Sequence, residues 1–231
     1  MGEKKKKEAA QKTWKKALFV IAAVLFVFVM VISSMGTNWI TGLAPVKAGD
    51  TVVLDYTIYD ASGIPFLTSS QQVYKEQAAK GVGILYAKQQ LTLTADRSLN
   101  QAIYPLTVYT PINGGSWQDF AIYSPEYDAI SSGVVGMKTS ETKKIVLPLN
   151  NTMTTLFSPE DLKKVNVNMS ALDIGDTMLM GVSENPNASA ANSTAVSYLR
   201  LGEISRKSDA GLVVDFGYPY AEITVYKFSN Q

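Results

Sequence analysis

Any chemistry that this chain performs must use neither histidine nor cysteine, because its 231 residues contain none of either. Their absence excludes disulfides, thiol chemistry, histidine acid–base catalysis and most zinc sites. The side chains that remain can act through an apolar surface, the shape of a pocket and hydrogen bonds. We therefore predict a function that needs no cofactor and no metal.

The stretch whose residue types best suit such a role runs from Ile130 to Pro148. Ile130, Val134 and Met137 are three and four residues apart, so a helical turn would place them on one buried face. Residues 144–147 have strand character, and Pro148 ends the strand because it has no N–H to donate. This spacing is also typical of an ordinary helix–turn–strand connection.

Charge and hydropathy divide the chain near its start. Lys and Arg (21) nearly balance Asp and Glu (20), so no nucleic-acid partner is indicated. Lysines are concentrated before Ala17, and residues 17–32 are apolar without interruption. Extended by residues 33–36, this run approaches the ~20 residues that span about 30 Å of hydrocarbon, and Trp14 and Trp39 flank it.

We predict from this pattern a basic cytoplasmic tail over residues 1–16 and a transmembrane helix over residues 17–39 in contact with the lipid bilayer. The lysines on the N-terminal side predict a single-pass protein of the cell membrane with its C-terminal domain outside the cytoplasm. A cleaved secretory signal is the alternative interpretation.

The remaining chain is rich in predicted strands. Alternating, β-branched residues predict a strand over Thr51–Tyr59, and a turn at residues 60–63 leads into a second strand at Ile64–Thr68. Residues 71–80 could form a helix, and Ser158 is a plausible cap for the helical turn begun by Pro159. Further strands are predicted over Leu91–Thr94, Leu106–Tyr109, Gly175–Met180, Tyr198–Ile204, Leu212–Phe216 and Ile223–Phe228.

An aromatic-rich region lies within residues 70–124 and has two interpretations. Its rings could form a binding face, or they could belong to the core of an extended β-insertion. These aromatic residues are Tyr86, Tyr104, Tyr109, Trp117, Phe120 and Tyr123.

The order of several motifs resembles the FKBP family of peptidyl-prolyl isomerases. The motifs are Gly49-Asp50, Tyr56-Thr57, Gly63 with Phe66, and Val134-Val135-Gly136-Met137 before a Lys-rich strand. Asp215-Phe-Gly-Tyr-Pro-Tyr-Ala221 is similar to the Asp-Phe-Asn-His-Pro-Leu-Ala motif of an archaeal and bacterial branch. That branch carries a small β-domain inserted in the flap over the active site.

This resemblance implies an α+β, mostly β fold, in which the predicted transmembrane helix precedes an FKBP-like antiparallel sheet with a short helix and an inserted small β-domain. The FKBP-like domain would comprise residues 46–150 and 212–231, with residues 70–124 as an extended insertion. The inserted β-domain would comprise residues 151–211.

The resemblance also implies how the chain could act. Rotation about an X–Pro bond has a barrier of about 18–20 kcal/mol, and an apolar pocket that favours the twisted amide lowers it without a nucleophile or metal. The implied catalytic positions are Tyr56, Phe66, Tyr127 and Ile130, and the implied substrate-binding positions are Met153, Tyr218 and Tyr220. Three positions depart from the family: Leu67 replaces an acidic residue, Asn151-Thr-Met153 replaces the Ala-Tyr-Gly of the flap, and Lys227 replaces an aromatic residue unless Phe228 takes its place.

Three functions are compatible with these features. The first is a membrane-tethered, extracytoplasmic peptidyl-prolyl isomerase and folding chaperone whose clients are proline-containing polypeptides. The second is a catalytically inactive FKBP-fold docking module or subunit of a membrane or cell-surface assembly. The third is an unrelated β-rich extracellular domain.

Four Asn-x-Ser/Thr sequons are candidate glycosylation sites, which would suit an external glycoprotein. They begin at Asn150, Asn168, Asn187 and Asn192.

Overall fold

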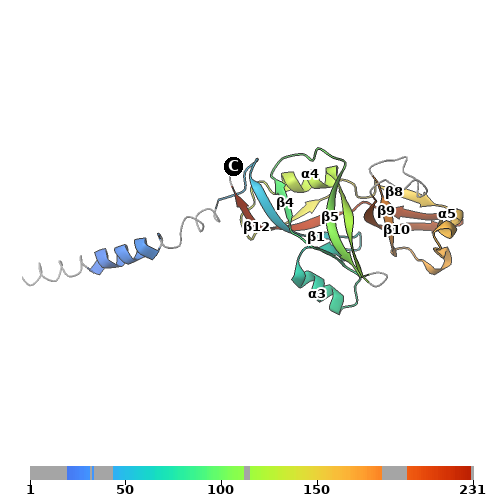
Figure 1. Ribbon diagram of the computed structural model, residues 1–231, viewed down its shortest axis with the longest axis horizontal. Helices are drawn as coiled ribbons and strands as arrows, with labels where there is room; N and C mark the ends of the chain where they lie inside the picture. Colours follow the sequence, from blue (N-terminus) through green and yellow to red (C-terminus); the bar gives the residue numbers. More distant parts are fainter. Residues whose placement is uncertain (1–19, 32, 34–43, 112–114, 184–196, 230–231) are drawn as a thin grey trace, which may run out of the picture. The chain divides into compact units, whose positions relative to one another are not determined.

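The computed structural model describes residues 20–31, 33, 44–111, 115–183 and 197–229. The chain forms two compact units, Met1–Ala44 and Pro45–Gln231. Figure 1 shows the strands of the second unit in two groups: β1, β4, β5 and β12 lie near α4, and β8, β9 and β10 lie near α5.

In the first unit, residues 20–31 form a helix with exposed apolar side chains. No helix within the described ranges is long and apolar enough to cross a membrane. The transmembrane helix predicted over 17–39, and the single-pass membrane location drawn from it, are therefore wrong. The predicted tail (1–16) and residues 17–19, 32 and 34–39 lie outside the described residues.

The second unit is built on one sheet of twelve strands in the order β7-β12-β1-β2-β3-β5-β6-β10-β11-β8, with β4 also paired to β1 and β9 to β10. Its elements are β1 (Thr51–Tyr59), β2 (Pro65–Thr68), α3 (Gln71–Ala79), β3 (Leu85–Ala87), β4 (Leu91–Thr94), β5 (Ile103–Thr110), β6 (Ser116–Tyr123), α4 (Ser124–Gly133), β7 (Thr142–Val146), β8 (Thr154–Phe157), α5 (Pro159–Lys164), a 3-10 turn (Met169–Ala171), β9 (Thr177–Val182), β10 (Tyr198–Ser208), β11 (Gly211–Asp215) and β12 (Tyr220–Ser229).

The predicted fold class is wrong in its sheet as well as in its membrane helix. The prediction was an antiparallel sheet with a separate inserted β-domain, whereas one continuous sheet contains the strands of both parts. The two parts join where Leu199 of β10 pairs in parallel with Phe120 of β6, and β2 also runs parallel to β3. Periodicity shows which segments are strands, but it does not show which strands exchange hydrogen bonds.

Helix α4 packs against the larger of two apolar clusters in this unit. Ile130, Val134 and Met137 are all buried in that cluster, which confirms the shared face predicted for them. Gly133 allows the close approach of β7, because a Cβ there would lie 2.4 Å from Cδ1 of Ile145. The turn that follows the helix ends at Gly136, whose φ of +84° is unstrained only for glycine.

The smaller apolar cluster lies among the strands near α5. Its buried members are Leu162, Met178, Ile204, Leu212, Val214 and Phe216. The α5 cap is as predicted, since Ser158 Oγ accepts from the backbone N–H of Asp161 and Pro159 is the first residue of the helix.

Candidate functional site

Five of the seven predicted pocket residues come together in the larger apolar cluster. Tyr56, Phe66, Tyr127, Ile130 and Tyr218 are between 2% and 8% exposed. The other two lie elsewhere: Met153 packs against the smaller cluster, and Tyr220 stacks on Tyr59 at 4.7 Å between ring centroids. The predicted catalytic residues are therefore neighbours, but two of the predicted substrate-binding residues are not beside them.

Phe66 and Tyr218, two of these residues, form with Phe120 a group of three neighbouring rings, called here the closed cluster. The ring of Tyr218 lies 4.4 Å from that of Phe66 and 6.2 Å from that of Phe120, between centroids. Its hydroxyl donates to the carbonyl oxygen of Leu201 at 2.7 Å. The cavity beside Phe66 and Tyr218 has a volume of about 10 Å³, and one water needs about 10–15 Å³. A proline ring does not fit there.

A buried ion pair holds the closed cluster in place. Arg200 and Glu126 are fully buried, and the guanidinium binds the carboxylate through two contacts, Nη2–Oε1 at 2.5 Å and Nη1–Oε2 at 2.8 Å. The guanidinium also donates to the carbonyl oxygens of Ala121 and Phe216. It lies 4.1 Å from the centroid of the Tyr218 ring. Burial alone would lower the pKa of Arg200, but Tyr218 and Glu126 together raise it, so the charge is retained.

The sequence analysis missed this ion pair. Glu126 and Arg200 are 74 positions apart, and nothing local links them. The one available signal was an arginine between Leu199 and Leu201 in a predicted strand, but alternation does not show which side of the sheet such a residue faces.

Leu67 is fully buried in the larger cluster, at the position where the resemblance implies an acidic residue. The hydroxyl of Tyr56 is buried and has no hydrogen-bond partner within the described part of the chain. Burial raises the pKa of Tyr56 well above its ordinary value, and Tyr104 and Asp55 add to the effect. An unpaired buried hydroxyl is unfavourable.

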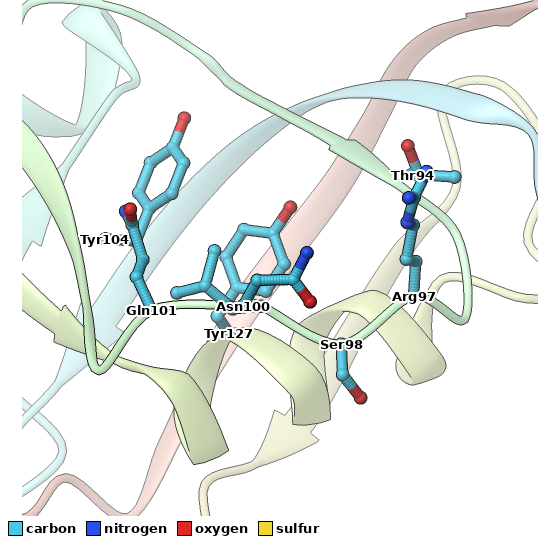
Figure 2. A pocket seen from close by; sticks show the side chains of 8 residues that line it. Thr94, Arg97, Ser98, Asn100, Gln101, Tyr104 and Tyr127 are labelled. Atoms are coloured by element: carbon cyan, nitrogen blue, oxygen red, sulfur yellow. The ribbon is translucent and has the colours of Figure 1, made fainter.

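A second site, open to solvent, lies on the other side of Tyr127. This depression, the Arg97 cleft, has a volume of about 330 Å³. Figure 2 shows Tyr127 between Arg97 on one side and Tyr104 with Gln101 on the other. The two tyrosine rings are 5.2 Å apart between centroids. The cleft is lined by Thr94, Arg97, Ser98, Leu99, Asn100, Gln101, Tyr104 and Tyr127.

Most of the lining belongs to one loop, residues 95–102, which helix α4 holds by its backbone. The buried Ser131 hydroxyl accepts from the N–H of Arg97 at 2.9 Å and can donate to the carbonyl oxygen of Thr94 or Arg97. Asp128 Oδ1 accepts from the N–H of Leu99 at 2.8 Å. The loop is therefore anchored through its main chain, and its side chains remain available.

The electrostatics of the cleft centre on one cation. The Arg97 guanidinium makes no ion pair and no hydrogen bond with the described residues, and Arg97 is exposed. Burial raises the pKa of Tyr127, and Tyr104 and Asp128 raise it further, while Arg97 lowers it. Burial also raises the pKa of Tyr104. Both phenols therefore stay protonated at neutral pH and can donate hydrogen bonds.

The aromatic-rich region is partly in the core and partly exposed, so each of its two interpretations applies to some of its residues. Phe120 is fully buried, whereas Trp117 is 51% exposed and Tyr109 lies beside it at 5.5 Å between ring centroids. Tyr104 is half-buried and lines the Arg97 cleft. No local pattern in the sequence indicated the polar residues of that cleft.

The remaining predicted sites have mixed outcomes. Asn150 is half-buried and Asn168 is exposed, with its side chain accepting from the N–H of Ser170, while Asn187 and Asn192 lie outside the described residues. In the described ranges, no three acidic side chains come together in a way that could hold a metal ion.

Comparison with protein-family models finds no match to this chain. Comparison with curated proteins finds no match either. The FKBP-like interpretation rests on the sequence motifs and stays a prediction.

Proposed function

We propose that residues 45–231 are a docking module that resembles FKBP proteins and binds a protein partner without efficient isomerase activity. The observation that supports this proposal is the closed cluster, in which the Tyr218 ring lies against Phe66 and leaves about 10 Å³ beside them. Isomerisation of an X–Pro bond by this route needs an apolar space for the proline ring.

A second candidate, a peptidyl-prolyl isomerase, has one observation in its favour. The four predicted catalytic residues, Tyr56, Phe66, Tyr127 and Ile130, belong to the same apolar cluster. For this function Tyr218 would have to swing out, which breaks its hydrogen bond to Leu201 and its contact with Arg200. We favour the docking module because both of those contacts are buried.

Exchange NMR of an Ala-Leu-Pro-Phe peptide with the full chain separates the two candidates. We expect no acceleration of cis–trans exchange by the unmodified protein, because the cavity beside Phe66 and Tyr218 is too small for a proline ring. The Tyr218→Ala variant removes the filling ring and should bind the peptide, with chemical-shift changes at Phe66 and Ile130. Tyr218→Phe is the matched control, since it keeps the ring and should not bind. Accelerated exchange by the unmodified chain would reject the docking module in favour of the isomerase.

A further inference from the structure

The Arg97 cleft combines a fixed backbone with unused side chains. Ser131 and Asp128 hold the loop of residues 95–102 at Arg97 and Leu99, and the N–H of Asp96 donates to the carbonyl oxygen of Ser131 at 2.9 Å. Binding groups on such a support lose little freedom when a ligand arrives. The rigidity would be unnecessary for a loop that only connects β4 to β5.

The free groups of the cleft are mainly hydrogen-bond donors. They are the Arg97 guanidinium, the hydroxyls of Tyr104 and Tyr127, and the carboxamides of Asn100 and Gln101, none of which has a side-chain hydrogen bond within the described residues. A guanidinium carries five N–H donors and no acceptor. A lining of this kind suits a ligand that offers acceptor oxygens.

The charges around the cleft select for a ligand with a single negative charge. Arg97 is the only cation among the described lining residues. Asp96 on the same loop and Asp128 on α4 lie next to lining residues. A doubly charged phosphate would be repelled by these two groups, whereas a carboxylate can pair with the guanidinium through two parallel hydrogen bonds.

The volume of the cleft and its apolar lining residues indicate which group accompanies the carboxylate in the ligand. A volume of about 330 Å³ is at the lower end of the roughly 300–1,000 Å³ typical of ligand pockets. The rings of Tyr104 and Tyr127 and the side chain of Leu99 supply apolar surface beside the donors. This space suits one carboxylate together with one apolar or aromatic side chain.

We propose that the Arg97 cleft binds the C-terminal carboxylate of a polypeptide whose last side chain is aromatic or apolar. The carboxylate pairs with Arg97 and accepts from the tyrosine hydroxyls, while the last side chain lies against the tyrosine rings. Assigning the carboxylate to a polypeptide rests on the docking role proposed above, whereas the preference for a carboxylate rests on the cleft alone.

The test is an NMR titration of the full chain with acetyl-Gly-Ala-Phe as the free acid and as the C-terminal amide. We expect the free acid to shift the signals of Arg97, Asn100 and Tyr104, and the amide to bind about tenfold more weakly or worse, because it loses a charged hydrogen-bonded pair. Arg97→Gln should weaken binding of the free acid by a similar factor. Arg97→Lys should weaken it by less, because lysine keeps the charge but cannot form the two parallel hydrogen bonds. Arg206→Gln, at an exposed arginine on β10, is the matched control and should bind like the unmodified chain.

Three results would overturn the proposal. Equal affinity for the free acid and the amide would show that the carboxylate does not contribute to binding. Tighter binding of inorganic phosphate than of the free acid would show that the charge argument is wrong. Equal or tighter binding of 3-phenylpropionate would assign the site to a small acid instead of a polypeptide. None of these results bears on proline exchange, so a failure of the carboxylate site can be told apart from a failure of the docking role.

Discussion

The closed cluster and the Arg97 cleft are built from the same kinds of residue, yet one is filled and the other is open. Each contains a pair of neighbouring aromatic rings, with centroids 4.4 Å apart for Phe66 and Tyr218 and 5.2 Å apart for Tyr104 and Tyr127. In the closed cluster, the Tyr218 hydroxyl has a partner in Leu201. In the cleft, neither tyrosine hydroxyl has one within the described chain. The two regions therefore differ in whether the tyrosine hydroxyls have hydrogen-bond partners, and not in the presence of aromatic rings.

Arg200 and Arg97 differ in the same way as the two regions that contain them. Arg200 is fully buried, and its charge is balanced by Glu126 and by two backbone carbonyl groups. Arg97 is exposed and has no ion pair in the described residues. A buried guanidinium with every donor satisfied contributes to a fixed core, whereas an exposed, unpaired one on an anchored loop can bind a ligand. Aromatic residues beside a helix therefore do not by themselves define a binding site.

The largest effect should come from breaking the closed cluster at its ion pair. Replacing Arg200 with Met leaves Glu126 buried without its partner, which typically costs about 3–5 kcal/mol of unfolding free energy. Chemical denaturation of the full chain measures this loss. The double variant Arg200→Met with Glu126→Leu should recover most of it, because no uncompensated charge remains. A loss below about 1 kcal/mol in the single variant would show that the pair does not hold the cluster together.

Local sequence patterns predicted the elements of this fold better than its connections. The strand predicted at Thr51–Tyr59 is β1 with the same bounds, and the Ser158 cap was also correct. These features depend on residues within one turn or one strand. The parallel contact between β6 and β10 and the pair of Glu126 with Arg200 join distant segments, so neither periodicity nor capping rules could indicate them.

The candidate site was harder to predict for the same reason. The apolar residues of the predicted pocket are neighbours, but whether they enclose a space depends on Tyr218 and Arg200, which arrive from later parts of the chain. In β6, residues 120–122 are all buried while residues 117–119 are exposed. Strict alternation would instead have buried every second residue of β6. The observed burial depends on which neighbouring segments cover each half of the strand.

A smaller effect should follow from loosening the cleft at its anchor. Ser131→Ala removes the buried hydroxyl that accepts from the Arg97 N–H and donates toward Thr94 or Arg97. Leaving these buried groups unpaired should cost about 1–3 kcal/mol, and the Arg97 amide should exchange with solvent faster. Native-state hydrogen exchange and chemical denaturation measure the two effects.

Ser132→Ala is the matched control for this anchor. Ser132 is the next residue, exposed, and its hydroxyl makes one bond of 3.3 Å to Asp96. We expect the unfolding free energy of the Ser132→Ala variant to differ from that of the unmodified chain by less than about 0.5 kcal/mol. The hydrogen exchange rate of the Arg97 amide should not change. If both serine variants gave the same exchange rate at Arg97, the loop would not be anchored through Ser131.

The smallest effect concerns two buried tyrosine hydroxyls of the larger apolar cluster, one with a hydrogen-bond partner and one without. The Tyr218 hydroxyl donates to Leu201, so Tyr218→Phe should lower the unfolding free energy by about 1 kcal/mol. The Tyr56 hydroxyl has no partner in the described chain, so Tyr56→Phe should raise the unfolding free energy by up to about 1 kcal/mol, because no desolvated group is left unpaired. Parallel denaturation curves of the two variants test for this opposite sign. Destabilisation by both would mean that the Tyr56 hydroxyl is hydrogen-bonded in solution.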